Sequence, residues 1–242
     1  MNALNALNAF LFIGLPYAAM LIFVIGLALR YRNRGFTITS LSSEFLEGRA
    51  LFWGVVPFHF GLLVILTGHF LAFLLPSATL AWNSEPLRLI ILEVSAFTFG
   101  VSVLVGLLAL MVRRVVNPRV RAVTTPMDVV VELLLLAQVI LGCWIALGYR
   151  WGSSWFAADL SPYLWSLLKL SPQTDAVYAL PWVIKLHIVG AFLLVLLVPF
   201  SRLAHIFVAP LHYFARPYQQ VIWNWDRKRI RDPSRGWRKA RP

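Results

Sequence analysis

Four histidines lie inside two long apolar segments that contain almost no charge. His59 and His69 lie in the first segment, and His187 and His205 lie in the second. An imidazole in hydrocarbon is costly without a partner, so four of them predict a ligand that satisfies them together. Haem iron is such a ligand, because each low-spin haem takes two axial imidazoles. Four histidines on two helices therefore predict two haems.

Other roles for these side chains are weighed against haem ligation. A single histidine of a membrane helix can simply hydrogen-bond a neighbouring helix, and this remains the alternative for each residue taken alone. A zinc or copper site would gather three or four ligands at one point, and the segments around these histidines bring no Cys, Asp or Glu near them. Gly61, Gly68 and Gly190 flank the histidines, and each would admit either a flat macrocycle or a neighbouring helix.

The elements that must position the histidines are membrane-spanning helices. Of the 242 residues, 60% are apolar and 13% are charged, and the mean hydropathy is +0.74, which is outside the range of a soluble domain. Long unbroken apolar runs exclude the alternating pattern of barrel strands, so an all-α polytopic bundle is predicted. Five transmembrane helices are expected, at about residues 8–29, 51–75, 87–112, 127–147 and 182–208.

These helices define one predicted domain and one tail. We expect residues 1–210 to form a dihaem transmembrane domain, and residues 211–242 to form a basic, Trp-containing cytoplasmic tail. The longest connection, residues 149–181, has scattered aromatic residues and few charges, which predicts a short helix in the membrane interface rather than a sixth span.

The basic residues orient the bundle, because cytoplasmic loops are enriched in Lys and Arg. Of the 22 Lys and Arg residues, all but Arg88, Arg150, Lys169 and Lys185 fall in the loops after spans one and three, or from Arg202 onward. The N-terminus is therefore predicted outside and the C-terminus in the cytoplasm. This topology, with attraction to anionic headgroups, accounts for the net charge of +12 without nucleic-acid binding.

The predicted topology also pairs the histidines. Spans two and five run in opposite directions, so His59 and His205 lie toward the cytoplasm, and His69 and His187 lie toward the exterior. The spacing of 18 residues on span five is a rise of about 27 Å, whereas ten residues on span two rise only about 15 Å. Helix tilt, side-chain reach and a bend at Pro199 have to absorb the difference of about 12 Å.

Three segments carry a resemblance to a known family. They read PFHFGLLVILTGHFLAFLLP, NPRVRAVTTPMD and KLHIVGAFLLVLLVPFSRLAHIFVAPLHYFARPYQ, and they resemble the gamma subunit of membrane-bound respiratory nitrate reductase, a dihaem cytochrome b. The resemblance covers spans two to five and the start of the tail. It implies that quinol is oxidised near the outer haem, and that electrons pass through the inner haem to an iron-sulfur subunit and then to a molybdenum catalytic subunit. It also implies a multi-pass protein of the prokaryotic cytoplasmic (inner) membrane, whose terminal acceptor is reduced on another subunit.

Carried onto this chain, the resemblance makes His69 and His187 the ligands of the outer b-type haem, and His59 and His205 those of the inner one. Arg202, Arg113 and Arg114 could pair with haem propionates, or they could be ordinary basic residues of the cytoplasmic side.

The resemblance further places a ubiquinol or menaquinol site beside the outer haem. Gly68 and His69 match the family's GH motif next to the quinol pocket. The family's quinol-site lysine at the start of span three aligns with Leu89, and the neighbouring basic residue is Arg88. Lys185 could contact quinol or a propionate, and its alternative role is that of an interfacial lysine.

Two questions stay open from the sequence. The tail suits both a membrane surface and a docked iron-sulfur subunit. Other functions to be weighed are a quinone-interacting dihaem subunit of a sulfur or heterodisulfide redox complex, and a haem-free transporter.

Overall fold

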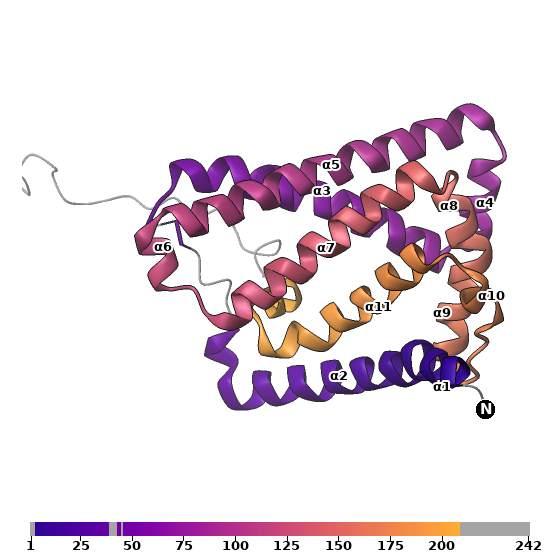
Figure 1. The fold of residues 1–242 in the computed structure, drawn as a ribbon, viewed down its shortest axis with the longest axis horizontal. Helices are drawn as coiled ribbons and strands as arrows, with labels where there is room; N and C mark the ends of the chain where they lie inside the picture. Colours follow the sequence, from indigo (N-terminus) through magenta and orange to yellow (C-terminus); the bar gives the residue numbers. More distant parts are fainter. Residues whose placement is uncertain (1–2, 39–42, 45, 209–242) are drawn as a thin grey trace, which may run out of the picture. The chain divides into compact units, whose positions relative to one another are not determined.

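The computed structural model describes residues 3–38, 43–44 and 46–208, with the side chains of residues 36 and 208 left aside, and the structural statements below concern this part of the chain. The predicted tail, residues 211–242, lies outside it. Five helices are long and apolar enough to cross a membrane, as the sequence predicts (Figure 1). They are Ala3–Arg34, Arg49–Leu74, Pro86–Val116, Pro126–Gly148 and Trp182–Phe200.

The first and last spans each combine several helical segments. Span one consists of α1 (Ala3–Ala9), a π-helical turn (Phe10–Gly14) and α2 (Leu15–Arg34). Span five consists of α11 (Trp182–Leu197) and a 3-10 turn (Val198–Phe200). Spans two, three and four are the single helices α3 (Arg49–Leu74), α5 (Pro86–Val116) and α7 (Pro126–Gly148).

Prolines and caps set where these helices begin. Pro86 and Pro126 stand in the first turns of α5 and α7, where the missing backbone N–H costs nothing. Thr125 and Asp128 form a capping box at the start of α7, since each side chain accepts a hydrogen bond from the other's backbone N–H. The same rule starts two short helices, α4 (Pro76–Asn83) and α6 (Pro118–Ala122).

Glycines bring α3 and α5 into close contact. A Cβ atom added at Gly106 would lie 2.5 Å from the backbone nitrogen of Phe58 and 2.8 Å from the carbonyl oxygen of Gly54. One added at Gly61 would lie 2.9 Å from the carbonyl oxygen of Phe99. Small residues at such crossings let helices pack in lipid, where no hydrophobic force holds them together.

The two histidine-bearing helices have different packing partners. α3 packs along α5, whereas α11 lies between α7 and α2 (Figure 1). In the described part of the chain, α3 and α11 share no comparable interface.

The long connection between spans four and five forms short segments at one end of the bundle. They are α8 (Gly152–Trp155), a π-helical turn (Phe156–Leu160), α9 (Ser161–Leu168) and α10 (Asp175–Ala179). As predicted, the connection contains no sixth span among the described residues.

This connection caps the end of α3. Ser161 donates a hydrogen bond to the carbonyl of Ala72 (3.1 Å), and Trp165 donates one to the carbonyl of Phe73 (3.0 Å). Carbonyls in the last turn of a helix lack intrahelical partners, so these side chains satisfy them.

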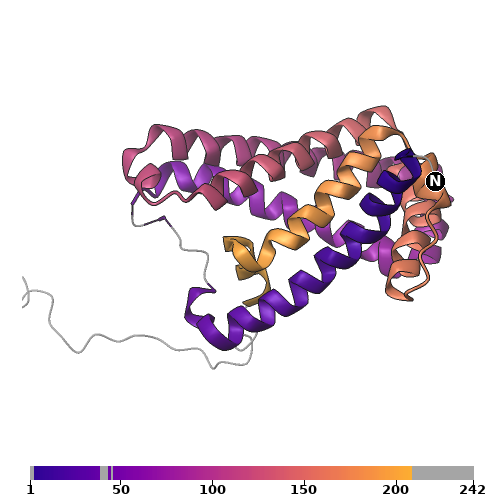
Figure 2. The same ribbon diagram turned by 60° about the horizontal axis from the view of Figure 1, so that its bottom comes forward.

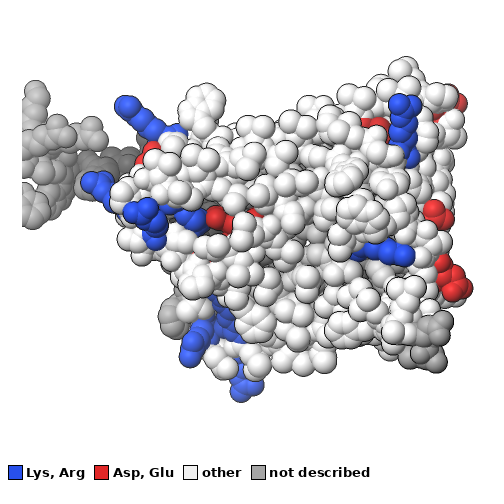
Figure 3. Space-filling view, viewed as in Figure 1, with Lys and Arg blue, Asp and Glu red and all other residues white. Residues whose placement is uncertain are grey.

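Basic side chains gather at the opposite end, where α6 lies (Figure 3). The described basic residues of that end are Arg30, Arg32, Arg34, Arg49, Arg113, Arg114, Arg119, Arg121 and Arg202.

Candidate haem and quinol sites

Span five breaks between its two histidines. Its α-helix ends at Leu197, the 3-10 turn reaches Phe200, and Ser201 is extended, with φ −120° and ψ 179°. A second 3-10 segment, Arg202–Val208, leaves the line of the α11 axis (Figure 2). The regular helix thus ends before the predicted boundary at residue 208.

The break removes the mismatch between the two histidine spacings. From His187 to the end of the α-helix at Leu197 there are ten residues, a rise of about 15 Å. His59 and His69 are also ten residues apart. The 3-10 turn adds only three residues, and the chain leaves the helix at the extended Ser201, so the residues from there to His205 do not continue the ladder.

The structure brings His59 and His205 together. Their ring centroids lie 6.3 Å apart, with an angle of 56° between the ring planes. Two imidazoles that bind one metal ion from opposite sides, with metal–nitrogen bonds of about 2.0 Å, have centroids roughly 6 Å apart. The spacing therefore fits a bis-histidine ligated iron.

Three of the four histidines bond a backbone carbonyl through Nδ1. His59 reaches the carbonyl of Val55 at 3.0 Å, and His69 that of Ile65 at 2.9 Å. His205 reaches the carbonyl of Arg202 at 2.6 Å. Such a bond places the proton on Nδ1 and leaves Nε2 as the ligating atom, which is the usual arrangement of a metal-binding histidine.

His187 differs from the other three. Its Nδ1 is buried and makes no hydrogen bond of regular geometry among the described residues, although the backbone of Gln138 lies close enough to act on the ring. It packs against α7, since a Cβ atom at Gly142 would lie 3.4 Å from its Cε1. His69 is near enough to act on it electrostatically, and the His69 ring lies 5.4 Å from that of Phe156. His69 and His187 thus lie within electrostatic reach of each other, and His69 lies at the end covered by the long connection.

The predicted quinol residues lie in different surroundings. Nothing stands within 4 Å of a Cβ atom placed on Gly68, next to His69. The Arg88 guanidinium lies over the ring of Trp82, 5.2 Å from its centroid. Lys185 donates a 2.7 Å hydrogen bond to the carbonyl of Tyr178.

Of the three arginines considered for propionates, Arg113 is committed elsewhere. It is 7% exposed, its Nε forms an ion pair with Glu47 at 2.6 Å, and its other nitrogens bond Ser43 and the Glu47 carbonyl. The guanidinium therefore fastens the start of α3.

Arg114 and Arg202 lie beside His205. Together they line a cavity of about 130 Å³ that Asp128, Glu132 and His205 also line. Arg114 pairs with Glu132 at 2.7 Å, and Arg202 pairs with Asp128 at 2.8 Å. The two arginines and two carboxylates balance in charge.

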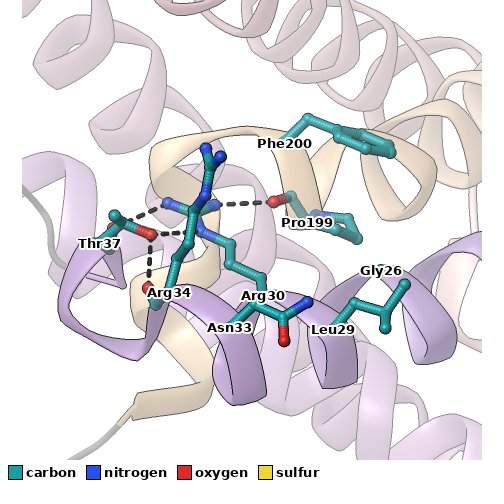
Figure 4. A pocket seen from close by; sticks show the side chains of 8 residues that line it. All are labelled: Gly26, Leu29, Arg30, Asn33, Arg34, Thr37, Pro199 and Phe200. Atoms are coloured by element: carbon teal, nitrogen blue, oxygen red, sulfur yellow. Dashed lines mark hydrogen bonds between the residues drawn. The ribbon is translucent and has the colours of Figure 1, made fainter.

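Sequence reasoning missed Arg30. Its Nη1 donates a hydrogen bond to the carbonyl of Pro199 (2.8 Å), and its Nη2 donates one to the carbonyl of Thr37 (Figure 4). Nη1 donates a second hydrogen bond to the carbonyl of Ser201 (2.7 Å). Arg30, Thr37 and Pro199 line an open pocket of about 430 Å³. An arginine at the end of a span has the same sequence pattern whether its side chain contacts lipid headgroups or a backbone carbonyl. The sequence alone therefore could not identify Arg30.

Sequence comparisons agree with this geometry. The family model described as "Nitrate reductase gamma subunit" matches residues 8–224. The nitrate reductase gamma chain of Bacillus subtilis is 31% identical over 208 residues, which are 84% of this chain and 93% of that protein. The respiratory nitrate reductase 1 gamma chain of Escherichia coli is 34% identical over 223 residues, which are 89% and 97% of the two chains. The nitrate reductase-like protein NarX of Mycobacterium tuberculosis is 32% identical over 232 residues, 92% of this chain but 35% of that longer protein.

Proposed function

The chain belongs to the nitrate reductase gamma subunit family, and we propose that His59, His69, His187 and His205 hold its two haems. It is the membrane dihaem cytochrome b subunit of a respiratory nitrate reductase, which is an oxidoreductase complex. This membership favours a gamma chain over a haem-free transporter and over a subunit of a sulfur or heterodisulfide complex.

The pairing of the histidines is supported most by one contact. His59 and His205 come from opposite ends of the chain, yet their rings lie 6.3 Å apart, with both Nδ1 atoms bonded to carbonyls. They would ligate the inner haem through Nε2. His69 and His187 would ligate the outer haem, and the packing of His187 against Gly142 would keep its ring oriented.

The chain's own residues would form the quinol site beside the outer pair. Gly68 leaves open space beside His69, where a quinol ring can approach the outer pair. Arg88 stacks over the ring of Trp82, and Lys185 donates a hydrogen bond to the Tyr178 carbonyl. We place both at the rim of this site. When bound, haem accepts and releases one electron at a time.

Electrons from quinol would pass from the His69–His187 end of the bundle to the His59–His205 end. From there they would reach an iron-sulfur subunit and then a molybdenum catalytic subunit, where the terminal acceptor is reduced. The protons of quinol would leave on the outside. This direction of electron transfer requires the Arg-rich end to face the cytoplasm, which the positive-inside rule supports. The membrane would be the cytoplasmic membrane of a bacterium.

Reduced-minus-oxidised difference spectra of the purified protein test this proposal. Expression with sufficient haem should give b-type absorbance at two haems per chain. Protein that is folded but shows no b-type absorbance would exclude haem ligation, and a single haem would exclude the two-pair arrangement.

A further inference from the structure

We propose that two arginine clamps, one formed by Arg30 and the other by Arg202 with Asp128, position His205 as a ligand of the inner haem. The proposal rests on the proposed function, because it concerns the same ligand. Its starting point is the break in span five, which puts His205 on a segment that no longer belongs to the α-helix.

Arg30 holds the break from the side of span one. One nitrogen of its guanidinium bonds the carbonyls on both sides of Phe200, those of Pro199 and Ser201. Where a helix ends, carbonyls lose their intrahelical partners and need others. Hydrogen bonds from a charged donor are about twice as strong as neutral ones. The guanidinium therefore fixes the path of the chain through the break.

Span one approaches the break closely enough to make this clamp specific. A Cβ atom at Gly26 would lie 2.8 Å from the Cβ atom of Pro199. Arg30, one helical turn further on, is anchored in turn by hydrogen bonds to Thr37 (Figure 4). The guanidinium is thus bonded to Thr37 on one side and to the break on the other. A shift of the broken segment would therefore cost hydrogen bonds to Arg30.

The second clamp holds the same segment from the side of span four. Asp128 is 8% exposed and is fixed at the start of α7 by its capping box with Thr125. Its other carboxylate oxygen pairs with Arg202 at 2.8 Å. The carbonyl of Arg202 accepts the bond from Nδ1 of His205 at 2.6 Å. Asp128 therefore acts on the orientation of the His205 imidazole through Arg202.

Arg30 and Asp128 are positioning residues, since they hold the segment that carries His205 and do not contact the reacting centre. The carbonyl bonded to Nδ1 sets the orientation of a ligating imidazole and its basicity. If the clamps are loosened, the angle between the His59 and His205 rings, 56° in this structure, is no longer fixed. The electron paramagnetic resonance (EPR) spectrum of a bis-histidine haem depends on this angle, and its midpoint potential depends on ligand basicity.

The experiment uses the full chain with both haems, in membranes or purified. Arg30→Gln removes the first clamp, and Arg30→Lys keeps the charge but loses the planar fork that spans two carbonyls. Asp128→Asn removes the charge of the second clamp while its amide oxygen can still cap α7. Arg32→Gln is the matched control, because Arg32 is exposed, lies on the same helix and makes no hydrogen bond or ion pair with a described residue.

The readouts are EPR spectra and redox titrations of each haem, with the outer haem as the internal control for folding. We expect Arg30→Gln, Arg30→Lys and Asp128→Asn each to shift the EPR signal and the midpoint potential of the inner haem alone. Arg32→Gln should behave as the wild type does.

Three results would overturn the proposal. An inner haem unchanged in Arg30→Gln and Asp128→Asn shows that no clamp operates, and an equal shift in Arg32→Gln shows a general effect of charge. Loss of both haems in every variant, including Arg30→Lys, shows a role in folding alone. A wild-type protein without two b haems contradicts the proposed function instead, so the two failures are distinguishable.

Discussion

His59, His69 and His205 each commit one ring nitrogen to a backbone carbonyl three or four residues earlier. The other nitrogen of each ring, Nε2, is then available to ligate iron in the proposed haem sites. The proximity of His59 and His205 could be predicted from sequence, because it depends only on which end of a span each histidine occupies. The support around the histidines could not, because Arg30 bonds carbonyls, and a carbonyl belongs to every residue and leaves no trace in the sequence.

Replacement of His187 by alanine should remove the outer haem and spare the inner one. His187→Ala takes away one axial ligand of the outer pair, and a low-spin haem requires two. His205→Ala should have the opposite effect. The ratio of haem to protein and the difference spectrum of each variant measure this, with Cys143→Ala as the control for a half-buried substitution within a span. If His187→Ala retains both haems, the pairing is wrong.

The ion pair of Glu47 and Arg113 should make the protein sensitive to acid. Hydrogen bonding from the backbone N–H of Ala50, and then from Arg113, lowers the pKa of Glu47 below its ordinary value of 4.5. A lowered pKa in the folded state means that the ionised carboxylate stabilises the fold above pH 4.5, and that this contribution is lost as the pH falls through the lowered pKa.

Glu47→Gln should therefore lower the Tm at pH 7, and the difference in Tm from the wild type should shrink as the pH falls through the lowered pKa of Glu47. Thermal unfolding of both proteins across this range gives the comparison. Glu85→Gln, a substitution at the other end of the bundle, should leave the profile unchanged. A constant difference between Glu47→Gln and wild type at all pH values would contradict the assignment.

At the level of elements, the five spans follow from composition, because length and apolarity alone decide whether a helix can cross lipid. The break in span five does not follow from them. Pro199 indicates a disturbance of the helix, but the extended Ser201 and the second 3-10 segment make contacts with Arg30 and Asp128 in other spans, which a local pattern does not contain. The 18-residue spacing of His187 and His205 therefore predicts a long rise between them only if the whole segment is one helix.

The packing of α3 against α5 should tolerate no side chain at Gly106. The Cβ atom of Gly106→Ala would lie 2.5 Å from a backbone nitrogen, and backbone atoms cannot move aside without displacing the helix. Overpacking of this kind costs about 1–3 kcal/mol, so the Tm should fall. Gly68→Ala is the matched variant, since its Cβ atom meets nothing within 4 Å.

Gly68→Ala should keep the Tm of the wild type and raise the KM for a quinol analogue, if the open space beside His69 admits quinol. Thermal unfolding followed through haem absorbance, together with steady-state quinol oxidation, tests both variants. Equal losses of Tm in the two variants would contradict the packing argument.

In the described part of the molecule, the arginines and the long connection between spans four and five lie at opposite ends of the bundle. Arginines gather at the end with α6, and α8, α9 and α10 lie at the other (Figures 1 and 3). The charge distribution could be predicted from sequence, because it follows from loop composition. The packing of the connection against Ala72 and Phe73 could not, because it depends on which side chains reach free carbonyls.

The predicted orientation can be measured with single cysteines. In a Cys143→Ser background, Asp175→Cys places a thiol near α10 and Arg119→Cys places one in α6, and both native residues are exposed. A membrane-impermeant maleimide applied to intact cells should label only the cysteine at position 175. Both should be labelled after permeabilisation. Labelling of position 119 alone in intact cells would reverse the topology.

The folded-back segment around Ser201 also fixes an order of events during synthesis. The chain emerges from its N-terminus, so Arg30 and Asp128 are made before the residues that they hold. His59, His69 and His187 precede the break, whereas His205 follows it. A nascent chain halted at the end of α11 would thus carry both histidines of the proposed outer pair and only one of the proposed inner pair. In the proposed arrangement, the inner site is the last to be completed.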